Sequence, residues 1–128
     1  MRFLLDTATF LIAAESTSRL SQSAREIIAD PDEDLFLSVI SAWEISLKHA
    51  LGKLKLPMAP DRLVPMARER MGVEELPLRE DAALRAGRLP DLHRDPFDRI
   101  LVSQAISMGL TIVTPDEAIR RYPVPTVW

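Results

Sequence analysis

The chain has 128 residues, of which 47% are hydrophobic and 27% charged, and its 16 basic and 19 acidic residues give a formal net charge of −3. These values predict one domain spanning residues 1–128, and they disfavour a passive nucleic-acid coat without excluding an enzyme that acts on nucleic acid. The absence of cysteine excludes disulfides, zinc–thiolate sites and cysteine nucleophiles.

Short apolar runs alternate with helical periodicity along the chain. In chain order the sequence predicts a strand at 2–5, helices at 7–15 and 21–30, a strand at 35–40, helices at 41–51 and 61–71, a strand at 73–76, helices at 79–89 and 97–108, a strand at 110–114, a short helix at 115–122 and a strand at 124–128. The prolines of the last segment predict an edge strand. The alternation predicts an α/β three-layer sandwich, in which helices flank a mostly parallel central sheet.

No predicted element is a membrane span, because no apolar run approaches the roughly 18 residues that one requires. The opening MRFLLDT also lacks the apolar region and cleavage site of a signal peptide. We therefore expect a cytoplasmic protein that does not bind membranes.

Four acidic residues from distant segments stand where predicted strands end or helices begin: Asp6, Glu44, Asp98 and Asp116. Ligands of open α/β sheets bind at the carboxyl edge of the strands. Helix 97–108 can also begin at that edge if it runs antiparallel to the sheet. We therefore expect the four carboxylates to meet there.

Helix capping is the alternative explanation for three of these acids. Ser41 to Glu44 and Thr114 to Glu117 have the spacing of a capping box. Asp95, followed by a proline and then by Asp98, has the pattern of an N-cap with an acid in the first turn. Asp6 has no such evident capping role, so the four acids together are better explained by a shared site.

Carboxylates crowded together repel one another and require a cation between them at neutral pH. Because the available ligands are oxygens, the fitting ion is Mg²⁺, for which Mn²⁺ can substitute. Such an ion activates water and stabilises a phosphoryl transition state.

Four motifs in order carry a family resemblance: MRFLLDT, SVISAWEISLKHALGKLKLP, HRDPFDRILVSQA and TIVTPDEAIRRYPVPTVW. Together they resemble a PIN domain, and specifically a VapC-type toxin ribonuclease of a toxin–antitoxin pair. The family's acids fall on Asp6, Glu44, Asp98 and Asp116, which makes Asp98 the ligand and Asp95 the N-cap. One departure is Ala8, where many relatives have a polar residue.

The resemblance implies a Mg²⁺-dependent endoribonuclease that cleaves tRNA or mRNA with metal-activated water. It also implies a homodimer and a cognate antitoxin that covers the acidic cleft. Asp6 and Asp98 are then expected to bind the metal directly, and Glu44 and Asp116 partly through water.

Other residues have candidate roles with simpler alternatives. Lys48, Lys53, Arg94 and Arg99 are candidate phosphate contacts, or else solvated charges. Thr7 and Thr114 are expected to hold acids or water in place, or only to cap helices. His49 and His93 are expected to be surface or packing histidines, and Trp43 to face the core more readily than an RNA base.

Two other functions remain open at this level. A phosphatase of the aspartyl-phosphate type would have a second acid where Ala8 stands, and a receiver domain would have a lysine after strand 110–114. A PIN fold that binds RNA or protein without cleaving is disfavoured by the four intact acids.

Overall fold

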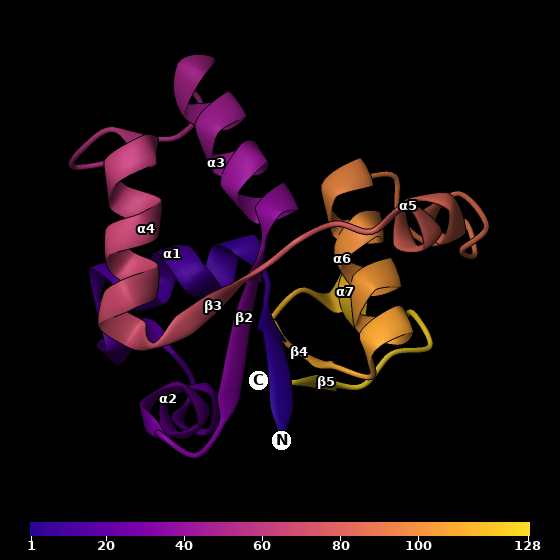
Figure 1. Cartoon of the computed structure of the whole chain (residues 1–128), viewed down its shortest axis with the longest axis horizontal. Helices are drawn as coiled ribbons and strands as arrows, with labels where there is room; N and C mark the ends of the chain where they lie inside the picture. The colour runs from indigo at the N-terminus through magenta and orange to yellow at the C-terminus, as the bar shows by residue number, and fades with distance from the viewer.

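The computed structural model describes residues 1–128 and consists of a five-stranded sheet with helices on both faces (Figure 1). The strands are β1 (Arg2–Leu5), β2 (Asp34–Ser38), β3 (Val73–Leu76), β4 (Thr111–Val113) and β5 (Thr126–Val127). The helices are α1 (Thr7–Glu15), α2 (Gln22–Ala29), α3 (Val39–Ala50), α4 (Pro60–Met71), α5 (Glu80–Ala86), α6 (Pro96–Met108) and α7 (Glu117–Arg120), with a 3₁₀ helix at Thr17–Arg19. None of the helices combines the length and the apolar character needed to cross a membrane.

All neighbouring strands pair in parallel, in the order β3-β2-β1-β4-β5. The predicted α/β sandwich is therefore confirmed, with a sheet that is wholly rather than mostly parallel. The expected edge strand is also confirmed, because β5 lies at one margin of the sheet and pairs only with β4.

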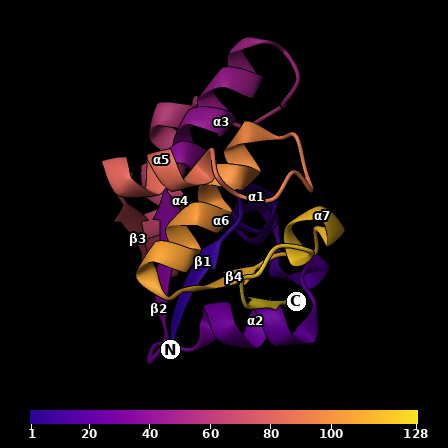
Figure 2. The same ribbon diagram turned by 90° about the vertical axis from the view of Figure 1, so that its right-hand side faces the viewer.

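The two faces of the sheet are covered by different helices, because side chains alternate along each strand. Phe3 and Leu5 of β1 pack into a core with α1 to α4, whereas Leu4 packs into a second core with α6 and α7. Figure 1 shows the first group of helices on the left of the sheet, and Figure 2 shows α6 in front of the strands. This leaves the carboxyl edge of the central strands between the two groups of helices.

The boundary between β2 and α3 differs from the prediction. The strand ends at Ser38 rather than residue 40, and α3 begins at Val39 rather than residue 41. Ser38 causes the change, because its hydroxyl accepts a hydrogen bond from the backbone N–H of Ile40 and donates one, 2.6 Å long, to Oε1 of Gln104. The predicted Ser41–Glu44 capping box is therefore wrong, and Glu44 lies in the second turn of α3.

The predicted helix 79–89 is shorter than expected, since α5 ends at Ala86. The carbonyl oxygens of Ala86 and Leu89 accept hydrogen bonds from the Arg99 guanidinium instead of continuing the helix. The segment between α5 and α6 is consequently an ordered loop fastened to α6.

Trp43 was expected to face the core, but the structure leaves its side chain 58% exposed. The next two residues, Glu44 and Ile45, are buried, so the indole of Trp43 lies on the face of α3 that points away from the core. Its indole packs edge-on against the Phe97 ring, with the ring centroids 5.2 Å apart.

Candidate functional site

The four predicted acids approach one another at the carboxyl edge of the sheet. Asp6 follows β1, Glu44 lies on α3, Asp98 lies in the first turn of α6, and Asp116 caps α7. The charges of Asp116 and Glu44 both act on the Asp98 carboxyl group, and that of Asp116 also acts on Asp6. Helix α6 begins at this edge because it runs back across the sheet before β4.

Asp6 has a capping role that the sequence did not reveal. Its Oδ1 accepts a 2.8 Å hydrogen bond from the backbone N–H of Thr9, which makes it the N-cap of α1. Its Oδ2 accepts a hydrogen bond from the Thr114 hydroxyl. The side chain is 3% exposed, and burial raises the pKa of its carboxyl group above 3.8. This hydrogen bond is the contact through which Thr114 would hold Asp6 in place.

Glu44 is held by two neighbours. The Thr7 hydroxyl donates a 2.7 Å hydrogen bond to its Oε1, and the Lys48 ammonium group forms an ion pair with its Oε2. The hydrogen bond that the Lys48 ammonium group donates to Glu44 raises the pKa of Lys48. The contact gives Thr7 a positioning role, whereas the direct contribution of Glu44 to an ion site stays a prediction.

The tightest cluster of potential ligands consists of His93, Asp98 and Asp116. One ligand atom from each lies within 4.8 Å of the others, and His93 Nε2 is 2.9 Å from Asp98 Oδ2. Asp6 and Glu44 lie outside this cluster.

Asp95 has a different function, as the N-cap of α6. Its Oδ1 accepts hydrogen bonds from the backbone N–H groups of Phe97 and Asp98, which confirms the predicted N-cap.

Several acidic side chains surround the carboxyl group of Asp98. Burial, followed by the charges of Asp95, Asp116 and Glu44, raises the pKa of its carboxyl group from 3.8 to about 7, against a lowering by the hydrogen bond from His93. The side chain is only 14% exposed. A carboxylate in this position is stabilised by any cation that enters the cluster.

This electrostatic arrangement predicts a pH-dependent difference between the metal-free wild type and an Asp98→Asn variant. Because the folded state favours protonated Asp98, its contribution to stability is greatest below pH 3.8 and is lost as the pH rises towards about 7. A shift of this size is worth at most about 4 kcal/mol, and partial solvation reduces the expected effect to about 1–2 kcal/mol. Urea unfolding in EDTA should therefore find the variant more stable than the wild type at pH 8, by a margin that shrinks at pH 5. A margin independent of pH would contradict the assignment.

The four basic residues predicted to contact phosphate have different surroundings. Lys48 lies beside the acids, with its ammonium group 5.9 Å from the centroid of the Phe97 ring. Lys53 and Arg94 are exposed. Arg99 differs from the prediction, because its guanidinium donates to carbonyl oxygens and to a tyrosine hydroxyl rather than facing solvent. Its acceptors are the carbonyls of Ala86, Leu89, Pro90 and His93 and the hydroxyl of Tyr122.

His93 is the site residue that the sequence reasoning undervalued. It was expected to be a surface or packing histidine, but its ring lies against Asp98. A usable signal was its place five residues before Asp98, in a loop bounded by Pro90 and Pro96. A loop that short has to fold back over the first turn of the helix that it enters.

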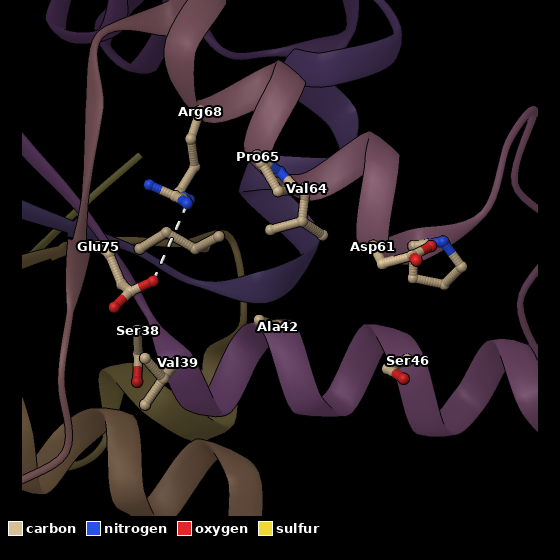
Figure 3. Close-up of a pocket in the computed structure, with 11 residues that line it drawn as sticks. Ser38, Val39, Ala42, Ser46, Asp61, Val64, Pro65, Arg68 and Glu75 are labelled. Carbon is tan, nitrogen blue, oxygen red and sulfur yellow. Dashed lines mark ion pairs between the residues drawn. The ribbon is translucent and has the colours of Figure 1, made fainter.

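A separate cavity of about 320 Å³ lies on the other side of α3, between α3 and α4 (Figure 3). Arg68 and Glu75 lie at one end of it, with 3.9 Å between Nη2 and Oε2. None of the four predicted acids lines this cavity, so it is distinct from the acidic cluster.

The fold and the cluster together define an α/β protein whose acidic side chains converge at the carboxyl edge of a parallel sheet. The chain belongs to the PIN domain family, whose model matches residues 3–125. No curated protein sequence matches the chain significantly.

Three solved structures share the fold over almost the whole chain. The first is VapBC2 from Rickettsia felis bound to a DNA fragment from its promoter, with 19% identity, a TM-score of 0.74, and coverage of 99% of this chain and 98% of that one. The second is DNA-bound VapBC from Salmonella typhimurium, with 20% identity, a TM-score of 0.67, and coverage of 99% and 97%. The third is a toxin–antitoxin complex from Klebsiella pneumoniae, with 15% identity, a TM-score of 0.62, and coverage of 98% and 95%.

Proposed function

We propose that this PIN domain is the toxin of a toxin–antitoxin pair and acts as a metal-dependent endoribonuclease. The observation that carries the proposal is the convergence of Asp6, Glu44, Asp98 and Asp116 on one sheet edge, where the pKa of Asp98 is raised to about 7. A fold that needed these acids only as helix caps would not crowd them against one another.

The donor set fits a divalent cation. Two carboxylates and an imidazole offer ligand atoms within 4.8 Å of one another. Only two side chains form ion pairs with the four predicted acids: Lys48 pairs with Glu44, and His93 pairs with Asp98. Mg²⁺ suits the carboxylate oxygens, and Mn²⁺ can replace it. Asp98 and Asp116 would hold the ion within this cluster. Asp6, expected from the sequence to be a direct ligand, and Glu44 would complete the surroundings of the ion from outside the cluster.

A bound ion of this kind supplies an activated water and stabilises charge on the phosphate that is cleaved. The chain's own residues then position the acids. Thr114 fixes one oxygen of Asp6, and Thr7 fixes one oxygen of Glu44. Lys48, Lys53 and Arg94 are the proposed contacts to the RNA backbone. Arg99 is not proposed as a contact, because its guanidinium donates to backbone carbonyls and to the Tyr122 hydroxyl.

The proposal includes protein partners. The similar structures from Rickettsia felis and Salmonella typhimurium are VapBC complexes, and the one from Klebsiella pneumoniae is a toxin–antitoxin complex. By this likeness of fold we propose a cognate antitoxin that covers the acidic cleft, a homodimeric toxin, and a cytoplasmic location.

The test is cleavage of a mixed tRNA and mRNA pool by the purified chain in Mg²⁺, Mn²⁺ or EDTA. Discrete products that appear with either metal and disappear in EDTA are expected. A folded, metal-loaded protein that binds RNA without cutting it would favour a non-cleaving PIN module instead.

The exposed Trp43 gives a prediction about RNA binding. It stands one residue before Glu44, and base stacking on an aromatic side chain contributes about 1–3 kcal/mol per base. Trp43→Ala should therefore weaken binding of single-stranded RNA about tenfold, measured by fluorescence anisotropy in an Asp98→Asn background that prevents cleavage.

The matched control for this variant is Leu51→Ala, because Leu51 is also 58% exposed and directly follows α3. It should leave RNA affinity unchanged. If Trp43→Ala changes the oligomeric state in size-exclusion chromatography and leaves RNA affinity intact, the indole belongs to a protein interface rather than to the RNA site.

A further inference from the structure

His93 is the imidazole of the acidic cluster. Its Nε2 lies 2.9 Å from Asp98 Oδ2, and the same cluster includes Asp116. The chain has two histidines. The other, His49, lies on α3 with its Nδ1 3.1 Å from the carbonyl oxygen of Leu54, so it serves a local turn.

The backbone of His93 is held beside the cluster by contacts that do not involve Asp98. The carbonyl oxygen of His93 accepts hydrogen bonds from the Arg99 guanidinium, at 3.4 Å, and from the Tyr122 hydroxyl, at 3.3 Å. Arg121 also donates to the carbonyl of neighbouring Leu92. These bonds fix the backbone from which the imidazole projects, so less conformational freedom of the loop remains to be lost on binding.

We propose that His93 is a nitrogen ligand of the divalent cation, together with Asp98 and Asp116, and that the site therefore prefers Mn²⁺ to Mg²⁺. The proposal rests on the proposed function, since it concerns the ion of that same site. Imidazole nitrogen is a good ligand for first-row transition metals, whereas Mg²⁺ retains oxygen ligands and water. The alternative role of His93 is a hydrogen bond that only orients Asp98.

The experiment that separates these roles is pulsed electron paramagnetic resonance of Mn²⁺ bound to the full chain without RNA. A ligating imidazole produces a nitrogen coupling on the Mn²⁺ signal. We expect this coupling in the wild type and in His49→Gln, and its loss in His93→Gln. Wild-type protein that binds Mn²⁺ without nitrogen coupling would overturn the proposal, whether or not the variant folds.

Affinities give the second measurement. His93→Gln should weaken Mn²⁺ binding about tenfold or more and Mg²⁺ binding, measured by competition, less than about threefold. Equal weakening of both ions would assign His93 to the orientation of Asp98 and overturn its role as a ligand. Circular dichroism of both histidine variants checks that they are folded.

Failure of this proposal is distinguishable from failure of the proposed function. Metal-dependent RNA cleavage without nitrogen coupling leaves the nuclease in place and removes His93 from the ligand set. Nitrogen coupling without cleavage of any RNA supports the ligand assignment and removes the nuclease. A folded chain that binds neither ion overturns both.

Discussion

Replacing Asp98 with asparagine should lower the rate of RNA cleavage at least about 1,000-fold. Asp98 is the acid on which the charges of Asp95, Asp116 and Glu44 all act, and His93 contacts it directly. An amide has the same shape but no charge, so the variant loses the attraction that holds a divalent ion. A loss of about 4 kcal/mol in transition-state stabilisation corresponds to three orders of magnitude in rate.

The fold should survive this substitution because Asp98 does not cap α6. That role belongs to Asp95, whose carboxylate accepts hydrogen bonds from the first turn. Single-turnover cleavage rates and thermal melts should be measured together. A variant that melts no lower than the wild type but does not cleave places the defect in the chemistry of the site.

Asp91→Asn is the matched control for Asp98→Asn. It makes the same change of charge at an exposed position of the α5–α6 loop, outside the acidic cluster. Its cleavage rate should stay within about twofold of the wild type. Metal-dependent cleavage by Asp98→Asn at more than a tenth of the wild-type rate would remove Asp98 from the catalytic set.

The order of the fold's elements follows from local patterns in the sequence. The run RFLL and the β-branched segment around Ile112 become neighbouring buried strands, because such runs are most stable where both faces are covered. The predicted N-cap Asp95 is confirmed, since a cap depends on residues within one helical turn.

Boundaries set by distant contacts could not be predicted in this way. The start of α3 depends on Ser38, which bonds to Gln104 from a different helix, 66 positions away. The indole of Trp43 packs against Phe97 of α6 rather than into the core. Neither the Ser38–Gln104 bond nor this aromatic contact could be inferred from residues nearby in the sequence.

The candidate site was predictable to the extent that topology determines it. Parallel strands bring their carboxyl ends together, so Asp6 and Asp116 approach each other although they are far apart in sequence. Helical or strand periodicity gave no signal for His93, because it lies in a loop; only its spacing from Asp98 and the flanking prolines indicated its position. That loop is shaped by the side chain of Arg99, whose hydrogen bonds to the loop carbonyls were not predicted.

Arg99→Lys should therefore destabilise the protein rather than weaken RNA binding. The guanidinium donates to four backbone carbonyls and to the Tyr122 hydroxyl, which fastens the α5–α6 loop to α6 and α7. Lysine keeps the charge but lacks the planar set of donors needed to reach these acceptors. With several charged hydrogen bonds lost, we expect the free energy of unfolding to fall by about 2–4 kcal/mol, and Tm by about 10 °C.

Arg121→Lys is the control for this prediction, because Arg121 makes a single exposed hydrogen bond to the same loop, at the carbonyl of Leu92. Its effect on stability should stay below about 1 kcal/mol. Hydrogen exchange should also accelerate for the amides of residues 87–95 in Arg99→Lys and not in Arg121→Lys. If Arg99 contacted phosphate instead, the lysine variant would keep its stability and lose RNA affinity, with a weaker dependence of binding on salt. Because both variants preserve the positive charge, a stability loss confined to Arg99→Lys would show that the geometry of the guanidinium fastens the loop that contains His93.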